Sequence, residues 1–483
     1  MSEKSAAGDF FPINQNRGSA RDVAAFAPVP NHVVEPASGR SDPRRKILLD
    51  LFRSALQSVD GQLCVRDALN AAASTAGGAR RRPVWAAAVG KAASSMLLGA
   101  HDAFGNALTR SLLITKDDHV TPRAYGLPNV EIIESAHPMP DQRSLAAGER
   151  LLAWVDELPP ETDVLFLISG GASSLVESLV PGATFAQLTA LNARGLASGM
   201  TIVELNAQRS QLSQIKGGRL AARVAARLAS ANAAAGGATG GSGSGAGGGS
   251  VSGGRGPSGG SGSGANLGGG GPKARALFIS DVPGHDPAVI GSGLMGPSGP
   301  VDGIERTVIA SIDHAMERVR ADAQKCGLAA WKDPRVFDGP ADRMAVRFAH
   351  ELHMSANQLC VWGGESTVQL PDEPGRGGRN QHLALAAARI IAGHENLLLL
   401  VAGTDGTDGV TSDAGALVDG ETCSRVALSE IDVQVSLQRA DSATALGAAG
   451  DLIHTGPTGT NVGDIVIGLK ISRDAAAGLP CGS

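Results

Sequence analysis

Short apolar runs that end in glycine, serine or aspartate constrain the fold of this 483-residue chain more than any other sequence feature. Each run is followed by a pattern of helical period, and continuous apolar strands that alternate with helices are typical of parallel sheets covered on both faces. The sequence therefore predicts an α/β fold. Strands are predicted at 84–89, 112–115, 130–133, 164–168, 276–279, 359–362 and 397–402. Helices are predicted at 43–58, 92–104, 142–157, 216–230, 303–324, 341–354 and 380–393.

Two segments have compositions that cannot form a packed core. Residues 1–42 are polar and aperiodic, and residues 236–272 are almost entirely glycine and serine, so we expect both to be disordered. The glycine-rich tract is either a linker between domains or a loop inserted within one domain. We favour an insertion, because a strand predicted at 276–280 follows the tract and continues the alternation of strands and helices, and long loops cost little closure entropy.

Charge and cysteine content exclude several classes of protein. The chain has 42 basic and 47 acidic residues, a net charge of -5, so a nucleic-acid partner is not expected. No apolar stretch is long enough to span a membrane, and the N-terminus lacks the apolar segment of a signal peptide, so secretion is not expected. The five cysteines are widely spaced, so we expect reduced thiols and no zinc site, as in a cytoplasmic protein.

Two strand ends carry groups suited to anions. Ser169-Gly170-Gly171-Ala172-Ser173-Ser174 follows one predicted strand, and small residues with free N–H groups and hydroxyls can bind a phosphate or carboxylate. The alternative is a tight turn with a serine N-cap. Gly90-Lys91 follows another strand without forming a Walker A loop. A lysine opposes the positive end of a helix dipole, which favours an anionic ligand, although a solvated surface lysine is the alternative.

Arg379 follows a glycine turn and precedes an Ala- and Leu-rich helix. Its guanidinium can hold a carboxylate or phosphate through two hydrogen bonds, or can pair with Asp372 or Glu373 in the same loop.

Aspartates follow two further strands. Asp405 and Asp408 lie three residues apart in a glycine turn, where they can hold Mg²⁺, act as a base or form Asx turns. Asp281 stands at the end of another strand. A G-x-G-x-x-G match at 291–296 lies between Pro287 and Pro297, which is the wrong context for a dinucleotide site.

As an ordered set, the motifs from about residue 43 to 470 resemble the class II glycerate 2-kinases, whose C-terminal part is called the MOFRL domain. The motifs are Gly90-Lys91-Ala92, Glu134-Ser135-Ala136-His137-Pro138-Met139-Pro140-Asp141, Ser169-Gly170-Gly171-Ala172-Ser173, Ile215-Lys216-Gly217-Gly218-Arg219-Leu220, Ser280-Asp281-Val282, Gly363-Gly364-Glu365, Gly378-Arg379-Asn380-Gln381, Asp405-Gly406-Thr407-Asp408-Gly409 and Thr455-Gly456-Pro457-Thr458-Gly459-Thr460-Asn461. The family often has Gly-Asp-Asp after its Ser-Asp-Val, whereas this chain has Gly284-His285-Asp286.

The resemblance implies ATP-dependent phosphorylation of D-glycerate to 2-phosphoglycerate with Mg²⁺. It implies two doubly wound, Rossmann-like α/β domains with the active site in the cleft between them. We assign residues 43–340, including the insertion 236–272, to a glycerate kinase domain, residues 341–475 to a MOFRL-type domain and residues 476–483 to a tail. A monomer or homodimer without nucleic-acid or membrane partners is expected. The family has also been labelled hydroxypyruvate reductase, so an NAD(P)H-dependent reductase is the alternative function.

The resemblance implies that Lys91 and Arg379 are essential, and our hypothesis adds Asp281 as the group that orients the 2-hydroxyl of glycerate. Mg²⁺ is expected at Asp281, Asp405 and Asp408, with Glu365 as a further candidate ligand. The residues expected to bind substrate or nucleotide are Ser169, Gly170, Gly171, Ser173, Ser174, Lys216, Glu365, Asn380, Asp405 and Asp408.

Overall fold

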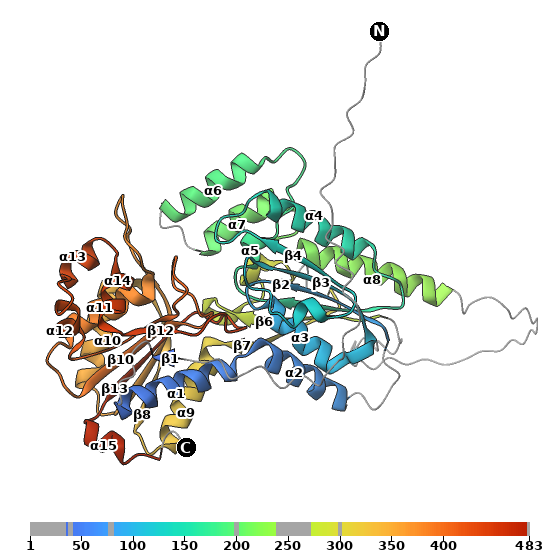
Figure 1. Ribbon diagram of the computed structural model, residues 1–483. Helices are drawn as coiled ribbons and strands as arrows, with labels where there is room; N and C mark the ends of the chain where they lie inside the picture. The colour runs from blue at the N-terminus through green and yellow to red at the C-terminus, as the bar shows by residue number, and fades with distance from the viewer. Residues whose placement is uncertain are drawn as a thin grey trace, which may run out of the picture.

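The computed structural model describes residues 35–36, 42–75, 82–197, 202–237, 272–297 and 302–480. Two sheets form two lobes; the strands of the first are drawn in blue to yellow, and most strands of the second in orange and red (Figure 1). Helices cover both sheets, so the predicted α/β class is confirmed. Almost all of the predicted N-terminal extension, and the predicted insertion from residue 238 to 271, lie outside the described residues.

The first sheet is parallel throughout and has the strand order β4-β3-β2-β5-β6-β7. Its strands are β2 (Val84–Val89), β3 (Leu108–Lys116), β4 (Val130–Ser135), β5 (Asp163–Ile168), β6 (Ala274–Ser280) and β7 (Ile304–Ser311). The direction of winding reverses between β2 and β5, as it does in doubly wound sheets, which bind ligands outside the carboxyl ends of the strands at that point. The glycine-rich tract falls between β5 and β6, which are neighbours in this sheet, so an insertion is favoured over a domain linker.

Helices lie on both faces of the first sheet. One face packs against α2 (Gly61–Thr75) and α3 (Ala93–Phe104). The other packs against α4 (Gln142–Asp156), α5 (Ala172–Leu175) and α8 (Arg219–Gly237), with Trp154 of α4 in contact with Trp85 and Phe166. Between β5 and α8 the chain forms α6 (Phe185–Ala197) and α7 (Ile202–Leu212).

The second sheet is mixed and has the order β1-β12-β11-β10-β13-β9-β8. Its strands are β1 (Glu35–Pro36), β8 (Ala330–Pro340), β9 (Leu359–Thr367), β10 (Leu397–Gly403), β11 (Gly415–Asp419), β12 (Leu452–His454) and β13 (Asp464–Lys470). Only β8 and β9 pair in parallel, so the prediction of parallel sheets is wrong for this lobe. The apolar run of β10 reflects burial on both faces, and burial does not depend on the direction of the neighbouring strands.

One face of the second sheet packs against α10 (Ala341–Met354) and α11 (Arg379–Ile390), and the other against α1 (Pro43–Ser58) and α9 (Ile312–Lys325). The helix predicted at 303–324 is wrong over its first part, because Ile304–Ser311 pairs with β6 as β7. Four shorter helices complete this lobe, namely α12 (Thr422–Ala427), α13 (Val433–Gln438), α14 (Ser442–Ala449) and α15 (Arg473–Ala477).

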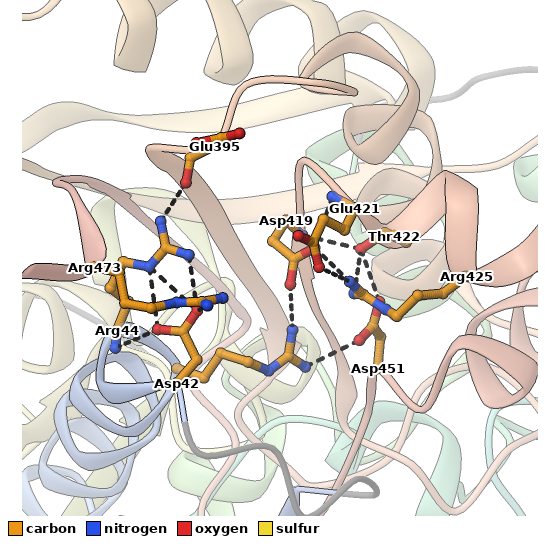
Figure 2. A network of polar contacts seen from close by, with 10 residues as sticks. Asp42, Arg44, Glu395, Asp419, Glu421, Thr422, Arg425, Asp451 and Arg473 are labelled. Carbon is orange, nitrogen blue, oxygen red and sulfur yellow. Dashed lines mark hydrogen bonds and ion pairs between the residues drawn. The ribbon is translucent and has the colours of Figure 1, made fainter.

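A buried ion network fixes α1 to the second lobe (Figure 2). Arg45 of α1 pairs with Asp419 at 2.9 Å and with Asp451 at 3.1 Å, and Arg425 pairs with Asp419 at 2.7 Å. The helix nearest the N-terminus therefore packs on the C-terminal sheet, and β8 also belongs to that sheet. The predicted domain boundary between residues 340 and 341 stays a prediction. Because β8 belongs to the second sheet, the sheets favour a boundary after β7.

Cys326 is bonded in a disulfide, whereas Cys64, Cys360 and Cys423 are free, so the expectation that all cysteines are reduced is wrong for Cys326. In the described part of the chain, no helix is both long and apolar enough to cross a membrane.

Candidate active site

A cavity of about 590 Å³ lies between the two lobes. The first lobe contributes the last residue of β3 and residues that follow β2 and β4, and the second contributes the start of α11 and the loops beside β9, β10 and β13. Four predicted site residues line it, namely Lys91, Arg379, Asp405 and Asp408. The other lining residues are Lys116, His137, Pro138, Val368, Leu370, Pro374, Gly375, Gly377, Gly378, His382, Thr407, Gly409, Val410, Ala440, Asn461, Gly463 and Asp464.

Lys91 crosses the cleft to the opposite lobe. Its Nζ lies 2.8 Å from Oδ2 of Asp405, in the turn after β10. Burial opposes both charges, but the pairing outweighs it, so the pKa of Lys91 is raised and the pKa of Asp405 is lowered to about 2. Both groups are therefore ionised at neutral pH and form a link between the lobes.

The turn after β5 is joined to the turn that carries Lys91. The Ser169 hydroxyl accepts a hydrogen bond from the backbone N–H of Ala92 at 3.0 Å, and the Gly170 carbonyl accepts one from Lys91 N–H at 2.9 Å. A Cβ at Gly170 would lie 1.9 Å from Oδ2 of Asp281, so a larger residue here would displace the side chain of Asp281. The helix that follows, α5, has four residues, and the Ser174 hydroxyl bonds the Gly171 carbonyl. The phosphate-binding role of this turn stays a prediction.

Lys216 does not line the cavity. Its fully buried ammonium pairs with Glu177 at 2.6 Å and donates to the Ser173 carbonyl at 2.7 Å. Burial lowers the pKa of Lys216 against the attraction of Glu177. These contacts hold the segment after β5 in place, and the predicted role of Lys216 in ligand binding gains no support from them.

Arg379 begins α11 and is held by two carboxylates of the second lobe. Its Nε and Nη2 lie 2.7 and 3.1 Å from the oxygens of Asp464, and its Nη1 pairs with Glu365. Burial opposes the charge of Arg379, but the two carboxylates raise its pKa, while burial raises the pKa of Glu365. The guanidinium plane is therefore fixed, and the side chain does not pair with Asp372 or Glu373.

Asp408 caps α11 from the turn after β10. Its two carboxylate oxygens accept the backbone N–H groups of Asn380 at 3.1 Å and Gln381 at 2.8 Å. The side chain of Asn380 also donates to Asp408 and to Asp464. Burial raises the pKa of Asp408 to about 7, against these hydrogen bonds. Asp408 and Asn380 thus position the first turn of α11, which carries Arg379.

Asp281 directly follows β6 in the first lobe and lies beside the Gly170 turn. The side chain of Asn461, from the second lobe, donates to Oδ2 of Asp281 at 3.4 Å. Burial and the neighbouring Glu365 raise the pKa of Asp281 to about 6, against the charges of Lys91 and Arg379. A carboxylate with this pKa can accept a proton near neutral pH.

The predicted metal site of Asp281, Asp405 and Asp408 is not assembled. Nowhere in the described ranges do three or more His, Cys, Asp or Glu side chains form a group that could hold a metal ion. Asp405 is paired with Lys91, and the oxygens of Asp408 are bonded to the N-terminus of α11. These three aspartates therefore do not fit a metal centre built by the protein alone.

Sequence reasoning assigned no role to six polar residues that line the cavity, namely Lys116, His137, His382, Thr407, Asn461 and Asp464. Lys116 is the last residue of β3, so the rule that sites lie at strand ends would have found it. Asp464 begins β13, an antiparallel strand whose amino end faces the cleft. A rule based on the carboxyl ends of parallel strands could therefore not have predicted Asp464. Burial and the two nearby lysines lower the pKa of His137 to about 3, which keeps its imidazole neutral.

The G-x-G-x-x-G match does not form a dinucleotide site. Residues Ile290–Gly293 form a 3-10 turn in which Gly291 and Ser292 have φ values of 58° and 57°. The segment neither directly follows a strand nor opens an α-helix, as that fingerprint requires.

The fold and the cleft define a two-lobed α/β protein with lysine and arginine side chains lining the cavity between its lobes. Family models agree: residues 47–232 match a domain of unknown function, DUF4147, and residues 358–464 match the MOFRL family. A D-glycerate 2-kinase of Thermotoga maritima is 31% identical over 393 residues, which cover 80% of this chain and 90% of that protein. The chain therefore belongs to the glycerate 2-kinase family.

Other relatives extend this result. The crystal structure of a glycerate kinase from Thermotoga maritima superposes with a TM-score of 0.68 and 28% identity, over 89% of this chain and 99% of that chain. A protein of Agrobacterium vitis named as a putative hydroxypyruvate reductase is 33% identical over 431 residues, or 87% of this chain and 93% of that protein. Both names that the sequence suggested thus occur among the relatives.

Proposed function

We propose that this protein is a glycerate 2-kinase, which transfers the γ-phosphoryl group of ATP to the 2-hydroxyl of D-glycerate. The observation that carries the proposal is the cleft in which Lys91 and Arg379, from opposite lobes, face one cavity with carboxylates between them. Phosphoryl transfer depends mainly on positioning and on neutralising charge, and this set of groups is suited to both tasks.

In the proposed mechanism Arg379 binds an anionic oxygen group through N–H donors that its carboxylate partners hold in one plane. Lys91 neutralises phosphate oxygens beside it. The carboxylate of Asp281 accepts the proton of the glycerate 2-hydroxyl while that oxygen forms a bond to the γ-phosphorus. The bond from the γ-phosphorus to the bridging oxygen breaks, and ADP leaves with the electron pair. The pKa of about 6 suits Asp281 to this role.

The strand order of the first sheet supports a doubly wound, Rossmann-like nucleotide-binding lobe. A divalent cation would bind to the site as a complex with the phosphates of ATP, since proteins usually hold Mg²⁺ through one or two carboxylates together with substrate phosphates. No step above depends on the predicted three-aspartate site. The Lys91–Asp405 pair would hold the lobes together around the substrates and help to exclude water.

The direct experiment incubates the purified protein with D-glycerate, ATP and Mg²⁺ and follows the products by ³¹P NMR. We expect ADP and a phosphate monoester on the 2-oxygen of glycerate. A product phosphorylated on the 3-oxygen would contradict the assigned position, and an unchanged spectrum would contradict the kinase itself.

A hydroxypyruvate reductase is the second candidate, because the Agrobacterium vitis relative carries that name. A nicotinamide-dependent enzyme needs a cradle for the dinucleotide, and the turn at Gly291 to Gly296 lacks its geometry. The charges in the cleft suit phosphate and carboxylate groups better than a hydride transfer, so we place this function second.

A further inference from the structure

Lys116 is the one lysine or arginine lining the cavity for which the described part of the chain provides no ion pair or hydrogen bond to the side chain. Lys91 is paired with Asp405, and Arg379 with Glu365 and Asp464. The carboxylate that follows Lys116 in sequence, Asp117, is held by Arg143 at 2.7 Å. Most of the positive charge in the cleft is thus already balanced within the protein, whereas the charge of Lys116 is not.

An ammonium in this position is unfavourable for the protein alone. Lys116 is half-buried, and burial together with the repulsion of Lys91 lowers its pKa, against the attraction of Asp405, Asp117 and Asp118. Its neighbour His137 is neutral at physiological pH and offers no charge of either sign. An anion bound beside Lys116 would remove this electrostatic cost. Lys116 therefore contributes to the binding of a ligand and not to the stability of the folded protein.

The position of Lys116 indicates which anion it meets. It ends β3, the strand next to β2, and therefore lies at the same edge of the sheet as Lys91. Two lysines at adjacent strand ends suit a ligand with several negative charges, as a triphosphate has, better than the single carboxylate of glycerate. The strand order also reverses beside β2, where doubly wound sheets bind nucleotides.

We propose that Lys116, whose ammonium has no carboxylate partner in the described part of the chain, binds the phosphate groups of the nucleotide. This inference rests on the proposed kinase function. It assigns to the first lobe a phosphate-binding residue distinct from Lys91, whose charge is shared with Asp405. In this arrangement glycerate binds mainly to groups of the second lobe, among them Arg379.

The test compares Lys116→Gln and Lys116→Arg with a matched control, Lys273→Gln. Lys273 is an exposed lysine of the same lobe that precedes β6, at the amino edge of the sheet and hence on the opposite edge from Lys116. The dissociation constant of ATP is measured by calorimetry without glycerate, with and without Mg²⁺. The KM values for ATP and for D-glycerate are measured separately on the same preparations.

We expect Lys116→Gln to weaken ATP binding and raise the KM for ATP about 10- to 100-fold, as for a lost hydrogen bond to a charged group. The KM for glycerate should change less than about 2-fold, and Lys116→Arg should restore most of the affinity, since arginine keeps the charge. Lys273→Gln should match the wild type. The melting temperature without ligand should not fall in Lys116→Gln, because the replaced charge has no partner.

Two results would overturn the proposal: unchanged ATP affinity in Lys116→Gln, or a raised KM for glycerate with an unchanged KM for ATP. The second result would assign Lys116 to the carboxylate of the substrate. Failure of the proposed function gives a different pattern, in which the wild type binds ATP but releases no ADP with glycerate. The calorimetric comparison would still decide the role of Lys116 in that case.

Discussion

Arg379 illustrates how a single side chain is prepared for binding. Two-point contact with Asp464 and pairing with Glu365 fix the guanidinium plane, and Asp408 fixes the helix turn that carries it. An arginine held in this way presents its remaining N–H donors in one direction, with little entropy left to lose on binding.

Replacing Arg379 with lysine should lower kcat/KM about 10²- to 10³-fold while the melting temperature stays close to that of the wild type. An ammonium cannot reproduce the planar contacts with Asp464 and a substrate anion at once. The matched control is Arg376→Lys, an exposed arginine of the same loop, which should retain full activity. Near-normal kcat/KM in Arg379→Lys would remove Arg379 from the site.

Asp281 gives the proposed reaction a predictable pH dependence. Burial raises its pKa to about 6, and the proposed base must be ionised. At saturating ATP, kcat/KM for glycerate should therefore rise as the pH increases through about 6 and level off above it. The residual activity of Asp281→Asn should lack this rise of kcat/KM with pH. The γ-phosphate of ATP also titrates near neutral pH. If the rise of kcat/KM with pH persists in Asp281→Asn, the pH dependence belongs to the nucleotide and not to Asp281.

At the scale of the elements, apolar runs predicted five of the six strands of the first sheet, because buried strands carry few polar residues, but only β9 and β10 of the seven strands of the second. The same runs could not distinguish β10, which is antiparallel to both neighbours, from the parallel strands of the first lobe. The sequence also could not predict which charged residues of the site form ion pairs, since Lys91 and Asp405 are 314 residues apart. The sequence identified both residues as site candidates, and only the packing of the two lobes determines that they bind each other.

The segment between α8 and β6 provides a test of the insertion. Deleting residues 238–271 should leave activity intact and change the free energy of unfolding by less than about 1 kcal/mol, because loop closure entropy varies slowly with length. β5 and β6 pair directly, so the sheet does not depend on the deleted residues. Thermal denaturation and the kinase assay check this expectation. A deletion protein without a cooperative melt would show that the tract has a structural role.

At the scale of the whole molecule, α1 and α2 connect the two lobes. α1 packs on the second sheet with α9, and α2 packs on α3 of the first lobe, as Figure 1 shows from the blue end of the chain. The buried pairs of Arg45 with Asp419 and Asp451 hold this connection on the side of the second lobe.

Arg45→Ala should lower the free energy of unfolding by about 3–5 kcal/mol, because it leaves buried carboxylates without one of their partners. The control is Arg53→Ala on the same helix, whose partly exposed pair with Asp50 should contribute less than about 1 kcal/mol. Chemical denaturation of the two variants measures the difference. Equal stabilities would show that the network in Figure 2 does not hold α1 in place.

The central claim is that the interlobe cleft transfers phosphate to glycerate, and a paired assay on one preparation tests it most directly. ADP release is followed with D-glycerate, ATP and Mg²⁺, and nicotinamide absorbance is followed with hydroxypyruvate and NADH or NADPH. We predict ADP release that requires both glycerate and Mg²⁺, together with unchanged nicotinamide absorbance. Oxidation of NADH or NADPH by hydroxypyruvate, without glycerate-dependent ADP release, would contradict the account and make the protein a reductase.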